Sequence, residues 1–278
     1  MDVLEVDGAR LECQWVGPEN DGGPVLVFLH EGLGSVSLWR DFPAQVAAAT
    51  GLRAFVYSRQ GYGGSSPVPL PRPLDYLERE ARDVLPRLLD AAGIRSAILV
   101  GHSDGATIAL VHAALDRSGR VKAVAALAPH TFVEDMCVAA IAEVRKTYAE
   151  TRCHQFDDQR RAIAEVRKTY AETLRPRLVR HHGDNVDCAF WGWNGAWLDP
   201  GFKAMEFRPL LSSIAVPVVV IQGEDDEYAT AAQVDAVTAG VRGPVEGLML
   251  AACGHAPHRD QPEAVIAAIS RLITPLSA

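Results

Sequence analysis

The sequence predicts an α/β protein with a mostly parallel central sheet, flanking helices and an inserted helical cap. Short apolar runs alternate with helical stretches along most of the chain, which is typical of strands joined by helical crossovers. That alternation stops after Pro129 and resumes at Val216. With 278 residues and 48% hydrophobic content, the chain can bury one large core. We therefore expect one domain with an insertion.

The strands are predicted in chain order from short apolar runs. Leu4 to Val6 and Leu11 to Val16 predict an opening antiparallel hairpin. The runs that follow are Val25 to Leu29, Ala54 to Tyr57, Ala97 to Val100, Val121 to Leu127, Val218 to Ile221 and Leu248 to Ala251. Helices are expected over Leu74 to Ala92 and from Ala106 onward. Helical crossovers make the sheet mostly parallel, so residues that follow the strands gather at its carboxyl edge.

The interruption divides the chain into residues 1–130 and 210–278, which form the main domain, and residues 131–209, which form the cap. Such a cap would supply the pocket that a sheet edge lacks. Residues 140–151 recur without change at 162–173, an offset of 22. Each copy places an isoleucine, a valine and a tyrosine on one helical face. We expect two helices rather than one, the extra one peripheral, because Asp157 and Asp158 can cap a second helix.

The segment Gly101, His102, Ser103, Asp104, Gly105 follows a strand-like run and precedes small residues typical of a closely packed helix. Glycines two positions on either side of a serine allow a turn sharp enough to expose its hydroxyl. A serine presented in this way is a nucleophile once a base removes its proton.

A candidate base and candidate acids follow in suitable places. His255 comes just after the strand-like run Leu248 to Ala251, so its ring can reach the carboxyl edge of the sheet. The strand Val218 to Ile221 ends in Gln222 and Gly223, which precede four consecutive carboxylates, residues 224–227. A carboxylate in that turn can orient the histidine. The chemistry alone leaves the choice among the four open.

The order Ser, Asp, His, the GHSDG turn, the GxxD turn and the late GH loop together resemble the α/β-hydrolase superfamily, including its bacterial carboxylesterases and enol-lactone hydrolases with a helical cap. The resemblance covers most of the chain and implies the α/β-hydrolase fold. It selects Asp226 as the acid, with Asp225 as the alternative. It also implies that the loop His30 to Ser35 forms an oxyanion hole, with the N–H groups of Gly32 and Asp104 as donors. Glu31 stands where many relatives have glycine.

Further residues are candidates for the substrate pocket: His30, Glu31, His102, Trp191, Trp193 and Trp197. The tryptophans could anchor the cap to the main domain or line an apolar pocket, and different rings could do each. Asp104 suits the first turn of a helix, where the helix dipole favours a carboxylate. Alternatively, its charge beside the nucleophile would disfavour anionic substrates.

Composition excludes several other classes of function. The net charge of −8, with no cluster of basic residues, argues against nucleic acid. No segment is apolar enough for a signal peptide or a membrane span, and the five cysteines form no CxxC pair, so we expect reduced thiols in a cytoplasm. His181, His182, Asp184 and Asp187 lack familiar metal-ligand spacing, so no metal and no cofactor are expected. The protein could also form a homodimer.

We therefore expect a serine hydrolase that cleaves a small or medium carboxylic ester or lactone through an acyl-enzyme. One alternative is hydrolysis of a carbon–carbon bond in a ring-cleavage product, which the same three residues could serve. Another is a ligand-binding protein that keeps the fold without turnover. The partner in the first two cases is a small molecule.

Overall fold

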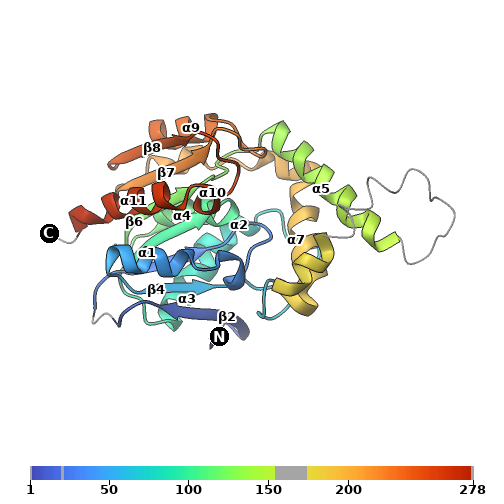
Figure 1. Cartoon of the computed structure of the whole chain (residues 1–278), viewed down its shortest axis with the longest axis horizontal. Coiled ribbons are helices and arrows are strands. Elements are labelled where there is room, and N and C mark those ends of the chain that lie inside the picture. Colours follow the sequence, from blue (N-terminus) through green and yellow to red (C-terminus); the bar gives the residue numbers. More distant parts are fainter. Residues whose placement is uncertain (1, 20–21, 154–173, 277–278) are drawn as a thin grey trace.

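A computed structural model describes residues 2–19, 22–153 and 174–276. Within these residues, eight strands form one sheet in the order β1-β2-β4-β3-β5-β6-β7-β8 (Figure 1). The pairs β1–β2 and β2–β4 are antiparallel, and the other neighbours are parallel. The strands are β1 (Asp2–Val6), β2 (Ala9–Val16), β3 (Val25–Leu29), β4 (Ala54–Tyr57), β5 (Ala97–His102), β6 (Val121–Leu127), β7 (Val218–Gly223) and β8 (Val245–Leu250).

The predicted fold class is confirmed, and each predicted apolar run overlaps one of the eight strands. Strands β3, β4, β5 and β7 are buried along their whole length, because helices cover both faces of the sheet and water reaches neither. The edge strand β8 is less buried and mixes Glu246 and Gly247 with its apolar residues. This mixed pattern explains why the sequence predicted only its last part.

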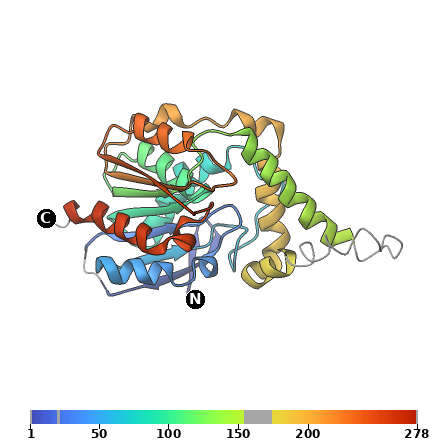
Figure 2. The same cartoon turned by 45° about the horizontal axis from the view of Figure 1, so that its top comes forward.

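Helices pack on both faces of the sheet. On one face, α1 (Phe42–Thr50) and α11 (Pro262–Ile273) lie side by side (Figures 1 and 2). On the other face, α4 (Asp104–Leu115) is buried almost completely against β5 and β6. The remaining helices of the main domain are α2 (Tyr76–Arg79), α3 (Leu85–Ala91), α9 (Ala232–Gly240) and α10 (Pro257–Asp260), with 3₁₀ turns η1 (Val36–Trp39) and η5 (Thr274–Leu276). Each face has its own apolar core.

The helical stretch predicted over Leu74 to Ala92 is confirmed, with one irregularity. A π-helical turn, η2 (Glu80–Val84), joins α2 to α3 without a break. At this turn Ala81 O accepts a hydrogen bond of 2.7 Å from Nδ1 of His112 on α4. The side-chain bond helps to accommodate the irregular backbone of the turn.

Between β6 and β7 the chain leaves the sheet and forms α5 (Asp135–Cys153), a helix over 174–182, η3 (Gly183–Asn185), α7 (Val186–Trp197), η4 (Pro200–Ala204) and α8 (Arg208–Leu211). The helices α5 and α7 pack together at one end of the sheet (Figures 1 and 2). The first copy of the repeat lies in α5, where Ile141 and Tyr148 are buried and Val144 packs against the core, as its helical periodicity predicts. The second copy, residues 162–173, lies outside the described residues.

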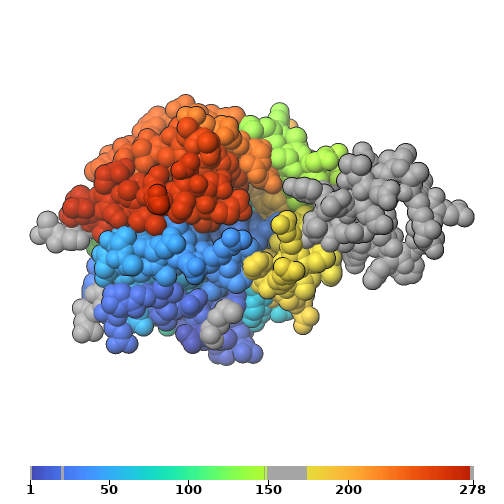
Figure 3. Space-filling view, in the orientation of Figure 1, coloured from blue at the N-terminus to red at the C-terminus, as the bar shows by residue number. Residues whose placement is uncertain are grey.

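Polar side chains fasten the inserted helices to the main domain. The ring of His182 accepts a hydrogen bond from Gly63 N at 3.0 Å and donates one to Leu33 O at 2.9 Å. Asn185 Nδ2 donates to the carbonyl oxygens of Gly63 and Ser65. In Figure 3 the yellow surface of this region lies directly against the blue surface of the N-terminal half. The insertion therefore rests on the loops that follow β3 and β4.

Candidate functional site

Ser103 occupies the sharp turn between β5 and α4. Its backbone has φ 53° and ψ −118°, a conformation that residues other than glycine rarely adopt. The turn is crowded: a Cβ at Gly101 would collide with Gly105 O, and a Cβ at Gly105 would collide with Leu29 O. Strain of this kind costs about 1–3 kcal/mol and persists where the surrounding packing enforces it. Here it holds the Ser103 hydroxyl clear of the backbone, as the glycine spacing predicts.

The structure brings Asp226 and His255 together with Ser103. His255 Nε2 lies 2.9 Å from Ser103 Oγ, and His255 Nδ1 lies 2.9 Å from both carboxylate oxygens of Asp226. The three side chains come from the carboxyl ends of β5, β7 and β8, which lie at one edge of the sheet. Asp225 is exposed, whereas the Asp226 side chain is fully buried. Of the two candidate acids, Asp226 is the one in contact with His255.

Asp226 is held in its ionised form. Burial opposes ionisation, but the hydrogen bond and charge of His255 and the N–H of Tyr228 outweigh it, so the pKa of Asp226 lies below its ordinary value. Its Oδ1 accepts hydrogen bonds from Tyr228 N at 2.8 Å and Ala229 N at 3.2 Å. A carboxylate fixed in this way can hold a proton on Nδ1 of His255, which leaves Nε2 free to accept the Ser103 proton.

The loop after β3 is held in place by a buried arginine. Arg59 is 1% exposed, and its guanidinium donates hydrogen bonds to the carbonyl oxygens of His30 and Glu31 at 3.0 and 3.1 Å. Gly32 lies against the indole nitrogen of Trp193, since a Cβ at Gly32 would collide with it. Gly32 borders the same cavity as Ser103, in a loop held by these contacts, where a backbone N–H can stabilise an oxyanion.

Asp104 presents its backbone and its side chain to different surroundings. Its amide begins α4, directly after Ser103, at the positive end of the helix dipole. Its carboxylate is buried and accepts hydrogen bonds from Tyr76 Oη at 2.6 Å and Trp197 Nε1 at 3.2 Å, with Arg59 at 3.7 Å. Burial raises the pKa of Asp104, and Arg59 and the two hydrogen bonds offset this only in part. The carboxylate does not line the cavity beside Ser103, which removes the basis for charge selection against anions by this residue.

A cavity of about 110 Å³ opens beside Ser103 and His255. Main-domain residues form one side, and residues of α5 and α7 form the other. Its walls are made by Glu31, Gly32, Leu33, His130, Cys137, Ile141, Trp193, Trp197 and Tyr228. Most of these side chains are apolar. The arrangement can therefore hold a small, mostly apolar group next to a serine hydroxyl paired with a base.

Comparison with known proteins places the chain in a family. The sequence model of the alpha/beta hydrolase family matches residues 26–268. The chain belongs to the alpha/beta hydrolase family. A protein from Caballeronia sordidicola named as an epoxide hydrolase is 42% identical over 106 residues, which are 38% of this chain and 31% of that protein. The match thus spans less than a third of that relative's length.

Solved structures show the same fold. The enol-lactonase from Burkholderia xenovorans LB400 has a TM-score of 0.72 at 20% identity, and the comparison covers 98% of this chain and 100% of the other. A thermophilic esterase from Thermogutta terrifontis has a TM-score of 0.69 at 17% identity, over 100% and 99% of the two chains. At these identities the likeness concerns the fold. The family and the fold together indicate that this protein is a hydrolase.

The three candidate tryptophans of this alpha/beta hydrolase have different surroundings. Trp193 and Trp197 line the cavity, and Trp197 also anchors α7 through its bonds to Asp104 and Tyr76. Trp191 does not line it. Its ring packs edge-on against Tyr148 of α5 at 5.5 Å, with the guanidinium of Arg145 5.5 Å away. Trp191 was therefore wrongly predicted as a pocket residue, because it faces the opposite side of α7.

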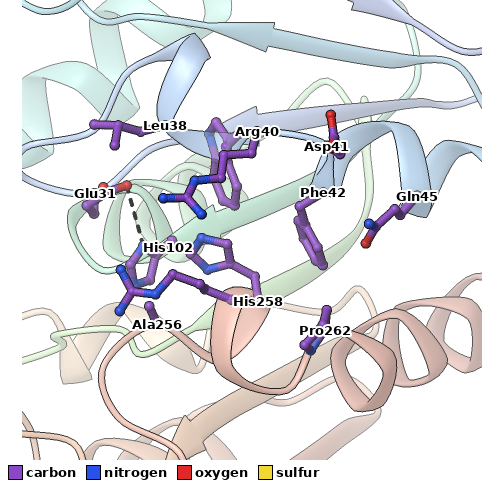
Figure 4. Close-up of a pocket in the computed structure, with 12 residues that line it drawn as sticks. Glu31, Leu38, Arg40, Asp41, Phe42, Gln45, His102, Ala256, His258 and Pro262 are labelled. Carbon is purple, nitrogen blue, oxygen red and sulfur yellow. Dashed lines mark hydrogen bonds and ion pairs between the residues drawn. The ribbon is translucent and has the colours of Figure 1, made fainter. Parts of the chain in front are cut away.

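Two other pocket candidates are also placed elsewhere. His30 is fully buried and interacts with Arg59 N and Glu31 O, so it supports the loop instead of lining the cavity. His102 donates from Nε2 to the carbonyl oxygen of His255 at 2.7 Å and lines a second cavity of about 270 Å³. Figure 4 shows this second cavity between the loop around Arg40 and the segment of His258. Neither Ser103 nor His255 lines it. Glu31 lines both cavities.

No group of three or more potential ligand side chains in the part of the chain that the structure describes could hold a metal ion. His181 hydrogen-bonds Ser37 Oγ, and Asp187 pairs with Arg175. Among the described helices, none is long and apolar enough to cross a membrane.

Sequence reasoning missed Arg59 and His130. Arg59 lies just after the predicted strand Ala54 to Tyr57, but a buried arginine there has no local signature. His130 lies three residues after the end of β6, and its place at the carboxyl edge of a strand next to β5 was a usable signal.

Proposed function

We propose that this alpha/beta hydrolase cleaves a small carboxylic ester or lactone through an acyl-enzyme on Ser103. The observation that carries the proposal is the chain of contacts from Ser103 Oγ to His255 Nε2, and from His255 Nδ1 to Asp226, each at 2.9 Å. We also propose that residues 131–209 form the cap, with residues 1–130 and 210–278 as the catalytic domain.

In the proposed mechanism His255 removes the Ser103 proton as the hydroxyl oxygen attacks the substrate carbonyl carbon. The amides of Gly32 and Asp104 stabilise the resulting oxyanion. His255 then protonates the leaving alcohol, and the bond between carbonyl carbon and leaving oxygen breaks. Water, activated by His255, attacks the acyl-enzyme and restores the Ser103 hydroxyl as the acid departs. No step requires a cofactor.

The serine at this position favours acyl substrates over epoxides. If Ser103 opened an epoxide, its oxygen would bond to a saturated carbon and form an ether. An ether has no carbonyl carbon for a His255-activated water to attack, so the enzyme would remain blocked after one event. An acyl-enzyme has such a carbon and can turn over. The activity in the name of the Caballeronia sordidicola relative is therefore not the one we propose here.

The cavity volume favours a small acyl group. An engineered protein cavity of roughly 150 Å³ holds one benzene molecule. At about 110 Å³, the cavity beside Ser103 suits an acyl group smaller than a benzene ring. We therefore expect acetyl to butyryl esters or small lactones to be preferred over long-chain esters.

A fluorophosphonate probe and a p-nitrophenyl ester series test this proposal. We expect the probe to label Ser103, and hydrolysis to fall steeply for acyl chains longer than butyryl. Ser103→Ala should abolish labelling and turnover, whereas Ser118→Ala, at an exposed serine, should leave both unchanged. Turnover of styrene oxide, or of a ring-cleavage diketone with negligible ester hydrolysis, would contradict the proposal. Persistent ester hydrolysis by folded Ser103→Ala would also contradict it.

A further inference from the structure

We propose that His130 is a substrate-binding residue that hydrogen-bonds an uncharged polar group on the acyl part of the substrate. The preferred substrates would then be esters or lactones of short hydroxy or oxo acids. This inference rests on the function proposed above and narrows its substrate class.

His130 lines the Ser103 cavity, and its ring makes no hydrogen bond among the described residues. The residue is 2% exposed, and its Nδ1 is buried without a partner. Buried polar groups in native proteins are nearly always paired. A buried histidine that borders a reactive cavity and has an unpaired ring nitrogen is explained if the substrate supplies the missing partner.

Packing fixes the position of His130 before any substrate binds. Thr107 on α4 bonds both its backbone N–H and its carbonyl oxygen, at 3.0 and 2.9 Å. The ring stands edge-on to Trp197, with ring centroids 5.1 Å apart, and its centroid is 5.5 Å from that of His255. Thr107 lies one helical turn after Ser103. His130 is therefore held rigidly relative to the nucleophile, as an orienting group must be.

The surroundings of His130 select an uncharged partner. Burial, followed by the nearby His255, lowers the pKa of His130 to about 3, so the ring is neutral at ordinary pH. A neutral imidazole has one N–H donor and one acceptor nitrogen, which suits a hydroxyl or a keto oxygen. A carboxylate substituent would gain no ion pair from the neutral ring. It would also meet the Glu31 carboxylate, which lines the same cavity.

Apart from His130, Ser103 and His255, the cavity walls carry polar side-chain atoms mainly on Glu31, Trp193 and Tyr228. Leu33, Ile141 and Cys137 contribute apolar surface or a weakly polar thiol. A substituent on the second or third carbon of the acyl group would lie within the small cavity, close to the carbonyl attacked by Ser103. His130 would thus distinguish a hydroxyl from a methyl group of nearly the same size.

Two pairs of esters test the inference: methyl lactate against methyl isobutyrate, and methyl 3-hydroxybutyrate against methyl 3-methylbutyrate. In each pair a hydroxyl replaces a methyl group. The readout is the ratio of the two kcat/KM values within a pair, measured by acid release. We expect the wild-type ratio to favour the hydroxy ester by about tenfold in at least one pair, the effect of one good hydrogen bond.

His130→Phe keeps a flat ring without nitrogen, and we expect it to bring that ratio to about one or below. His130→Gln, which retains a donor and an acceptor, should restore part of the preference. His112→Gln is the control, since it replaces another buried histidine whose hydrogen bond goes to Ala81 O, and it should leave the ratio unchanged.

An equal ratio in wild type and folded His130→Phe would overturn the inference while leaving ester hydrolysis intact. A wild-type ratio that favours the methyl analogue in both pairs would also overturn it. Absence of turnover on all four esters, together with no fluorophosphonate labelling of Ser103, would instead overturn the proposed function and the inference with it.

Discussion

Replacement of Asp226 by asparagine should lower kcat/KM for ester hydrolysis by about 10⁴-fold, or roughly 5 kcal/mol of transition-state stabilisation. The hydrogen bonds around the carboxylate explain this size. Oδ1 accepts from the N–H groups of Tyr228 and Ala229, so the amide oxygen of an asparagine must take that position. Its NH₂ group then replaces Oδ2, which lies 2.9 Å from His255 Nδ1.

A donor at that position favours the wrong tautomer of His255. The NH₂ group donates to Nδ1, which moves the ring proton to Nε2, the nitrogen that faces Ser103 Oγ at 2.9 Å. His255 can then no longer accept the Ser103 proton, although the fold is unchanged. The side-chain volume is also nearly unchanged, so the loss should appear in activity and not in stability.

The assay is p-nitrophenyl butyrate hydrolysis, with fluorophosphonate labelling as a second measure of Ser103 reactivity and thermal unfolding as the folding check. Asp225→Asn is the matched control, because Asp225 is the exposed neighbour and has no side-chain contact with His255. We expect it to stay within about twofold of wild type, as surface substitutions usually have small effects. Retention of more than a tenth of the activity by Asp226→Asn, or an equal loss in Asp225→Asn, would refute the reasoning.

Two predictions concern stability. Burial lowers the pKa of His258 to about 3, so between about pH 6.5 and 3 the unfolded chain binds a proton that the folded chain excludes. The free energy of unfolding therefore falls as the pH decreases, by at most about 1.4 kcal/mol per pH unit from this group. His258→Phe, packed against Trp39 and Phe42, should flatten that slope in urea unfolding at pH 6 and pH 4, and an unchanged slope would contradict this. Arg59→Met leaves the buried Asp104 carboxylate without its cation and should destabilise the protein by about 3–5 kcal/mol, measured by urea unfolding; a change below about 1 kcal/mol would argue against this role.

The sequence was sufficient for the features that depend on local spacing. Apolar runs gave the strands, and glycine spacing gave the turn at Ser103, because burial and steric crowding leave a signature within a few residues. His255 could be predicted from its place after a strand. Asp226 could be distinguished from Asp225 only by resemblance, since both lie in one turn and only the folded backbone decides which carboxylate faces His255.

Features that depend on contacts between distant segments were not predictable in the same way. Arg59 supports the loop at Glu31 through carbonyl oxygens, which have no side-chain signature. The tryptophans are a different case. Trp193 and Trp197 are four residues apart and share one face of α7, whereas Trp191 lies two residues from Trp193 and faces away. Had the segment been assigned as a helix, its periodicity would have distinguished the tryptophans that line the cavity from the one that packs elsewhere.

The contacts of Asp104 connect a feature that local spacing predicts, the turn at Ser103, with one that depends on distant segments, the position of α7. The residue after the nucleophile contributes its amide beside Ser103, and its buried carboxylate accepts a hydrogen bond from Trp197 of α7 at 3.2 Å. Trp197 in turn forms part of the wall of the cavity and packs against His130. One residue thus couples the position of the inserted helix to the position of the attacking oxygen. Substitutions in α7 that shift Trp197 should therefore alter the reactivity of Ser103 as well as the choice of acyl group, because Asp104 contacts Trp197 and directly follows Ser103.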